Sequence, residues 1–304
     1  MWRNILVPTD FSGAARQALQ LAVRLAPQEG MVHLFHVITP TESDPYSPMR
    51  LRPEVRARER TPEEVTEELL QQLIEDVAAE HGAVARAWRR ASDVVGAILD
   101  YADTVEAELI ILGTHGRRGL QRFLLGSVAE AVVRRAPVPV LTVREQARIP
   151  ETIHHILVPT DFSDDARLAL QEAGRWAAYF RARMTLLHVL SPALVPVAVT
   201  EMAAIYEVMP GLQERIQEEL TRWIDTEVPN TVQTNIRVEE GPIDLTILEQ
   251  ARREQADLIV MATHGRSGVA RWLLGSVTER VLRQAPCPVL TRCHRAFSET
   301  EGTP

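Results

Sequence analysis

The sequence carries the same motifs in the same order in its two halves. The hexapeptide V-P-T-D-F-S stands at 7–12 and again at 158–163. Three further pairs follow it: T-H-G-R-x-G at 114–119 and 263–268, R-x-L-L-G-S-V at 122–128 and 271–277, and A-P-x-P-V-L-T at 136–142 and 285–291. The period is half of a 304-residue chain, which is too long for a solenoid repeat. The pattern predicts tandem domains at 1–148 and 149–297, followed by a disordered tail at 298–304.

Apolar runs alternate with helical periodicity inside each half. In the first half, strands are expected at 3–9, 31–38, 84–88, 108–112 and 138–143. Helices are expected after Ser12 and after Thr61, which can cap a helix start. Two more are expected, one from Ser92 and one at 127–135 that stops before Pro137. The second half repeats this order. The alternation predicts an α/β fold of two tandem open parallel sheets with helices on both faces, which is Rossmann-like.

The composition of the chain excludes several classes of function. A net charge of -8 argues against a broad nucleic-acid surface, and no apolar run reaches the ~18 residues of a membrane span. The first residues lack the features of a signal peptide, so a cytoplasmic protein is expected. The chain contains no lysine, which excludes a P-loop lysine and a Schiff base. Cys287 and Cys293 would lie about 20 Å apart on an extended segment, which is too far for a disulfide.

A glycine pattern in the first half suits an anion. Gly113, Gly116, Gly126 and Ser127 form Gly-x-x-Gly-x9-Gly-Ser between a predicted strand and a predicted helix. Glycine allows close approach of the backbone to a ligand, and helix-start amides favour an anion. Asp10, at the end of another strand, suits a ribose hydroxyl, an adenine amino group or a metal. The alternative is that the glycines only permit a turn.

These motifs resemble the universal stress protein family over nearly the whole chain, as a tandem member of its ATP-binding branch. V-P-T-D-F-S, L-F-H-V-I at 34–38 and the glycine pattern carry the resemblance. It implies five-stranded parallel sheets in the order 3-2-1-4-5 and ATP, with or without Mg²⁺, as the ligand. The implied nucleotide-binding residues are Pro8, Thr9, Asp10, Val37, Gly113, Gly116, Arg117, Gly126, Ser127 and Val128, and in the second half Pro159, Thr160, Asp161, Val189, Ala262, Gly265, Arg266, Gly275, Ser276 and Val277.

The second half departs from the glycine pattern at one position. Ala262 stands where the first half has Gly113. Its methyl group could block a ligand, or strain the turn if the backbone φ is positive. Gly241 and Pro242 precede the next helix there, where the family often places a turn near the nucleotide. The first half is therefore expected to be the better phosphate cradle.

Three hypotheses about function remain open at this stage. The first is a nucleotide-binding regulatory switch without catalytic residues and with little or no hydrolysis. The second is a slow ATPase or a nucleotidyl- or phosphoryl-transfer enzyme, and the third is a scaffold that binds no nucleotide. The two halves are expected to pair through their last strands as an intramolecular pseudo-dimer, while a homodimer of tandems and a downstream protein partner stay open. Residues 39–62 are expected to form a loop, and residues 193–206 a lid, an interface patch or a buried helix.

Overall fold

The computed structural model describes residues 2–40, 60–77, 83–114, 125–191, 211–265 and 274–292. Most of the expected loop at 39–62, all of the apolar stretch at 193–206 and the tail at 298–304 lie outside these residues. The predictions for these segments therefore stay untested.

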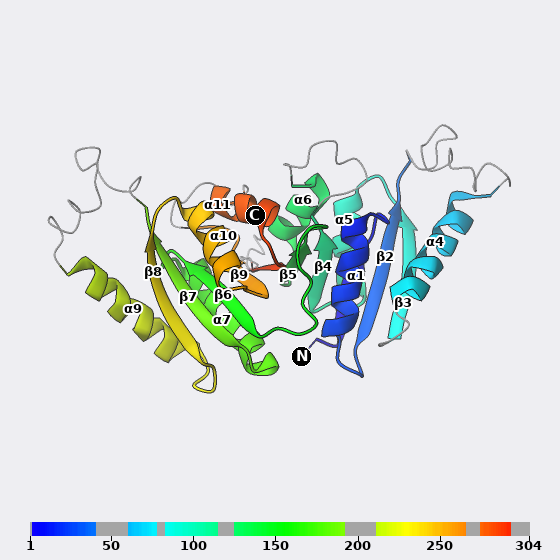
Figure 1. Cartoon of the computed structure of the whole chain (residues 1–304). Coiled ribbons are helices and arrows are strands. Elements are labelled where there is room, and N and C mark those ends of the chain that lie inside the picture. Colours follow the sequence, from blue (N-terminus) through cyan, green and yellow to red (C-terminus); the bar gives the residue numbers. More distant parts are fainter. Residues whose placement is uncertain are drawn as a thin grey trace, which may run out of the picture.

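Ten strands form one sheet (Figure 1). The first half contributes β1 (Asn4–Pro8), β2 (Met31–Ile38), β3 (Ala83–Arg90), β4 (Leu109–Gly113) and β5 (Val140–Val143). The second contributes β6 (His155–Thr160), β7 (Arg183–Leu190), β8 (Thr234–Glu240), β9 (Leu258–Ala262) and β10 (Val289–Arg292). The order β3-β2-β1-β4-β5-β10-β9-β6-β7-β8 contains 3-2-1-4-5 in each half. The predicted fold class is confirmed.

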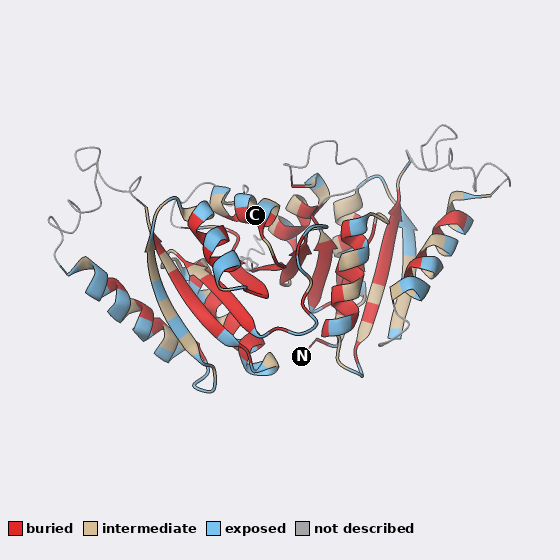
Figure 2. Cartoon of the chain, viewed as in Figure 1, coloured by how far each residue is buried: buried red, intermediate tan, exposed pale blue. Residues whose placement is uncertain are grey.

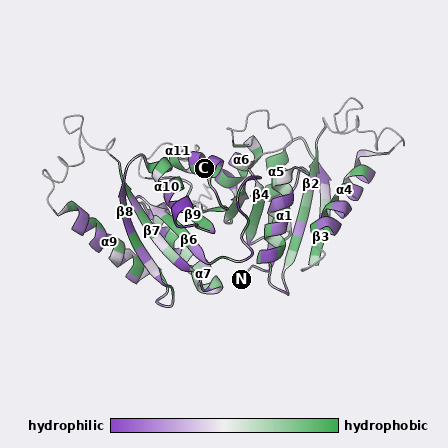
Figure 3. Cartoon of the chain, viewed as in Figure 1, coloured by the Kyte–Doolittle hydropathy of each residue, from purple (hydrophilic) through white to green (hydrophobic). Residues whose placement is uncertain are grey.

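Helices cover both faces of the sheet. They are α1 (Gly13–Leu25), α4 (Pro62–Val77), α5 (Val94–Thr104), α6 (Ser127–Arg135), α7 (Asp164–Phe180), α9 (Leu212–Glu227), α10 (Ile243–Arg253) and α11 (Ser276–Gln284). Buried residues of α1, α4, α7 and α9 share one core with the sheet, here called the α1 face. Buried residues of α5, α6, α10 and α11 share a second core on the other side of the sheet, here called the α6 face. Figures 2 and 3 show the buried, apolar residues concentrated in the central strands.

Side chains close to the helix starts explain where the helices begin. The Ser12 hydroxyl accepts from the Ala15 amide at 3.2 Å, as predicted. The predicted capping box of α4 is also present, because Thr61 N–H donates to Glu64 at 2.9 Å and Glu64 N–H donates to the Thr61 hydroxyl at 3.3 Å. The predicted start of α5 at Ser92 is two residues too early, because the helix begins at Val94. Asp93 is the cap, because its carboxylate accepts from the Gly96 amide at 2.9 Å.

The last strands of the two halves pair, as predicted. β10 runs antiparallel to β5 with Leu290 opposite Leu141, and both residues are fully buried. The hydroxyls of Thr142 and Thr291 each donate across the pair, to Val289 and Val140 carbonyls at 3.2 Å. This pairing removes the exposed edge of each half and joins the two expected sheets into one.

A second contact joins the halves through an aromatic cluster. Trp2, just before β1, lies against Trp176 of α7, with ring centroids 4.2 Å apart, and against Phe180 at 6.4 Å. Trp176 is completely buried. The segment connecting the halves is also anchored, because Arg148 donates to the Asp257 carboxylate at 2.6 Å. The boundary between the two domains, expected between residues 148 and 149, remains a prediction.

Candidate functional site

Each half changes strand order beside its first strand. β1 pairs with β2 on one side and with β4 on the other, and β6 pairs likewise with β7 and β9. In open parallel sheets, ligands bind at the carboxyl ends of the strands at such a reversal. The V-P-T-D-F-S motifs and the starts of the glycine motifs follow those strand ends.

The turn after β1 fixes the backbone around Asp10. We call residues 9–12 and 160–163 the Asp turns. The Thr9 hydroxyl accepts from the Phe11 amide at 3.0 Å, and the Asp10 carboxylate accepts from the Ser12 amide at 3.0 Å. The second half repeats both bonds, at 3.1 and 3.0 Å. There the Ser163 hydroxyl also donates to Asp161 Oδ1 at 2.6 Å.

The second Asp turn lies directly against the glycine loop. A Cβ placed on Gly265 would lie 2.5 Å from Asp161 Oδ2. Asp161 and Gly265 are about a hundred residues apart in the sequence. They are neighbours in the structure, as the sequence predicted. Gly116, Arg117 and Arg266 lie outside the described residues.

Each half has one helix start without a side-chain cap beside the end of its fourth strand. Gly126 precedes α6 and Gly275 precedes α11, each with extended backbone angles. Their own amides donate to the carbonyls of Thr114 and Thr263, at 2.8 and 2.9 Å. No side chain caps either start. The first-turn amides and the positive end of the helix dipole can therefore receive an anion.

Gly113 is needed for packing of α1. A Cβ there would lie 2.8 Å from the backbone carbon of Ala14 and 3.0 Å from the amide nitrogen of Ala15. Ala262, its counterpart, belongs to the α1-face core and is 8% exposed. Neither residue is among those with positive φ. The Ala262 methyl group therefore neither strains the turn nor lies on the α6 face.

Gly113→Ala is expected to lower the free energy of unfolding by about 1–3 kcal/mol, because α1 must shift away from β4. Ala262→Gly is the matched control and should cost only about 0.5–1 kcal/mol. Chemical denaturation of both variants measures the difference. Equal losses in the two would contradict a packing role specific to Gly113.

The remaining predicted residues lie at the same edges. Val37 and Val189 are buried on the α6 face, at 6% and 7% exposure, whereas Ser127 and Ser276 are exposed at the helix starts. The others at these strand ends and helix starts are Pro8, Thr9, Pro159, Thr160, Val128 and Val277. These residues therefore stand at strand ends and helix starts of their own halves, and their grouping into one site stays a proposal.

The helix that follows the third strand, α5 in the first half and α10 in the second, starts differently in the two halves. Asp93 caps α5 with its carboxylate, whereas α10 follows Gly241 and Pro242 and has no side-chain cap. Gly241 has a φ of +142°, which favours glycine. Asp244, in the first turn of α10, lies 3.5 Å from Arg280 of α11. An ion pair therefore links the first turn of α10 to the middle of α11 in the second half.

The titratable groups near the site and in the core do not form a metal or thiol centre among the described residues. The described part of the chain contains no cluster of three or more His, Cys, Asp or Glu that could hold a metal. Burial raises the pKa of the Cys287 thiol to about 12, so it stays protonated and is a poor nucleophile. His36 and His188 bond through Nδ1 to the carbonyl oxygens of Thr9 and Thr160, which is a structural role.

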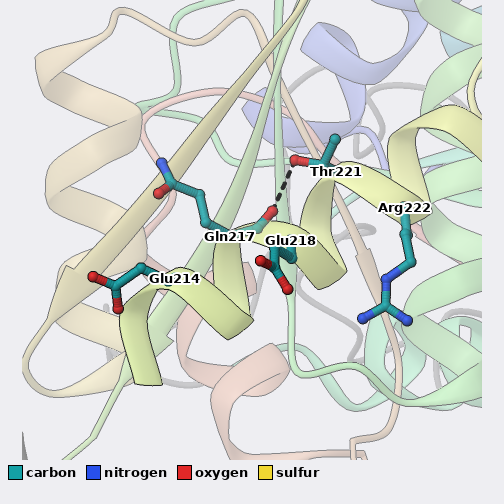
Figure 4. A pocket seen from close by; sticks show the side chains of 5 residues that line it. All are labelled: Glu214, Gln217, Glu218, Thr221 and Arg222. Atoms are coloured by element: carbon teal, nitrogen blue, oxygen red, sulfur yellow. Dashed lines mark hydrogen bonds between the residues drawn. The ribbon is translucent and has the colours of Figure 1, made fainter. Parts of the chain in front are cut away.

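A separate hollow of about 550 Å³ lies along α9 (Figure 4). All five lining residues come from this one helix: Glu214, Gln217, Glu218, Thr221 and Arg222. Thr221 donates to the Gln217 carbonyl of its own helix at 2.8 Å. None of the lining residues comes from a strand end, so the hollow is not part of the candidate site.

Comparison with known proteins identifies the fold. The sequence model of the Universal stress protein family matches residues 1–144 and 152–291. The chain belongs to the universal stress protein family. A universal stress protein of Mycolicibacterium smegmatis is 27% identical over 94% of this chain and 96% of its own length. The first curated mycobacterial relatives are 33% identical, and the chain covers 61% of their length.

The architecture is that of a solved universal stress protein. One from Archaeoglobus fulgidus matches with a TM-score of 0.63 and 21% identity, covering 95% of this chain and 97% of that one. Another, crystallised in complex with cAMP, is 24% identical over 47% of this chain and 98% of its own, with a TM-score of 0.35. Among the described residues of this universal stress protein, no helix is long and apolar enough to cross a membrane.

Proposed function

We propose that this universal stress protein binds an adenine nucleotide, chiefly ATP, at each of its two sites and acts as a regulatory switch in the stress response with little or no hydrolysis. The observation that carries the proposal is the arrangement seen in the second half. An uncapped helix start and an Asp carboxylate beside Gly265 occupy one edge of the sheet. The same motifs stand at the matching edge of the first half.

The two features suit opposite ends of a nucleotide. The amides at the starts of α6 and α11 favour the negatively charged phosphates. A carboxylate would repel phosphates but accepts hydrogen bonds from ribose hydroxyls or the adenine amino group. We therefore assign the Asp10 and Asp161 ends to the nucleoside and the Ser127 and Ser276 ends to the phosphates. Mg²⁺, when bound, would enter with the phosphates and could take the serine hydroxyl as a ligand.

The proposal of little or no hydrolysis rests on the side chains available. The chain has no lysine that could stabilise the charge on a transferred phosphoryl group. Binding energy would then be used to shift conformation or assembly. A cytoplasmic location stays a prediction.

Titration of the full chain with ATP, ADP, adenosine and inorganic triphosphate tests this function. We expect ATP to bind most tightly and adenosine measurably. Asp10→Ala with Asp161→Ala should weaken adenosine and ATP alike, because both share the nucleoside. No binding of any of the four would support a scaffold. Hydrolysis faster than about 1 per second, within the usual enzyme range, would favour the enzyme instead.

A further inference from the structure

The Asp turn has an unusual backbone in both halves. Phe11 and Phe162, the residues after the two aspartates, each have a φ of 62°. L residues with large side chains rarely adopt this left-handed region, and such strain persists only where the surroundings impose it. Glycine would adopt it without steric cost. A phenylalanine at both positions therefore indicates a role for the ring.

The ring lies on the opposite face of the sheet from the starts of α6 and α11. Phe11 and Phe162 pack against the α1-face core. Val37 and Val189 belong to the α6-face core. The residue directly after each aspartate therefore places its side chain on the α1 face, opposite the starts of α6 and α11.

A histidine on the neighbouring strand holds both sides of this turn. In the first half, the rings of Phe11 and His36 have centroids 4.6 Å apart, and His36 Nδ1 lies 2.7 Å from the Thr9 carbonyl oxygen. The corresponding distances in the second half are 4.7 and 2.9 Å. Because a carbonyl oxygen only accepts, Nδ1 donates in each pair. The histidine thus fixes the residue before the aspartate and the ring after it.

The second half connects the same ring to α9. Phe162 meets Trp223 edge to face, with centroids 5.5 Å apart. The guanidinium of Arg167 lies 4.8 Å from the centre of the Trp223 ring. These contacts add packing that resists movement of the Phe162 ring.

We propose that Phe11 and Phe162 are positioning residues for nucleotide binding. The ring, held by the histidine and the α1-face core, keeps the Asp turn left-handed, and this orients the aspartate toward the nucleoside. In the second half the oriented oxygen is Asp161 Oδ2, which faces Gly265, while Oδ1 accepts from Ser163. The inference rests on the proposed function, since it takes the aspartate as a nucleoside contact.

Substitution of Phe162 by alanine and by glycine tests the proposal. Both remove the ring, but only glycine favours a left-handed backbone. In a background that carries Gly126→Val and Asp10→Ala, which weakens binding of both ATP and adenosine by the first half, Phe162→Ala should weaken adenosine and ATP about tenfold or more, as is expected of Asp161→Ala. Phe162→Gly should bind both more tightly than Phe162→Ala. Binding of inorganic triphosphate should change in neither variant.

A double variant shows whether the effect passes through the aspartate. In an Asp161→Ala background, Phe162→Ala should cause no further loss of affinity. The same pair of substitutions at Phe11 repeats the comparison in the first half if Phe162→Ala does not fold. Unchanged affinity in a folded alanine variant, or glycine no better than alanine, overturns the inference and leaves the proposed function standing. A parent chain that binds no nucleotide overturns both.

Discussion

Gly126→Val is expected to abolish ATP binding by the first half and leave the second half intact. Gly126 has φ of -61° and ψ of 135°, angles that valine adopts readily, so the fold should survive. The added side chain would stand at the start of α6, where the phosphates are proposed to meet the amides. Calorimetry should show the stoichiometry fall from two nucleotides per chain to one.

Ser127→Ala is the matched control for Gly126→Val. It removes one hydroxyl contact and should cost about 1.5–3 kcal/mol of binding, roughly ten- to a hundredfold in affinity. Adenosine binding should be unaffected by Ser127→Ala. Two full-affinity ATP sites in folded Gly126→Val would instead show that the glycine only forms a turn.

Trp176→Ala is expected to cost about 3–5 kcal/mol of unfolding free energy. The side chain is completely buried and contacts Trp2 of the other half, with ring centroids 4.2 Å apart. Its indole N–H also donates to Glu172 at 3.0 Å, so the variant leaves a buried carboxylate with one donor fewer. Chemical denaturation measures the loss.

Trp88→Ala provides the comparison for Trp176. Trp88 lies on the edge strand β3 and is 38% exposed, so its loss should cost far less than that of Trp176. A loss below about 1 kcal/mol in Trp176→Ala would show that the aromatic cluster does not stabilise the fold.

The fold was predictable from sequence because the repeat and the apolar periodicity agree with each other. β2 was predicted at its observed bounds, as was α6. β3 gave the weakest signal because it pairs only with β2 and most of its side chains are exposed. The start of α5 was misplaced because Ser92 and Asp93 are both good caps, and sequence alone does not show which one contacts an amide.

The candidate site was predictable in its position but less so in its local geometry. Asp161 and Gly265 were expected at one edge, and they lie there. The packing of Gly113 on α1 was not foreseen, because a glycine motif does not show which neighbour needs the space. The left-handed angle of Phe11 was also missed, since such angles are expected for glycine or asparagine.

Native mass spectrometry of the full chain with increasing ATP tests the central claim, that each half holds one nucleotide, most directly. We expect masses that correspond to one and then two bound ATP molecules per chain, and a maximum of one in Gly126→Val. A folded parent chain that retains no nucleotide at millimolar ATP would contradict the account, as would a parent that never exceeds one.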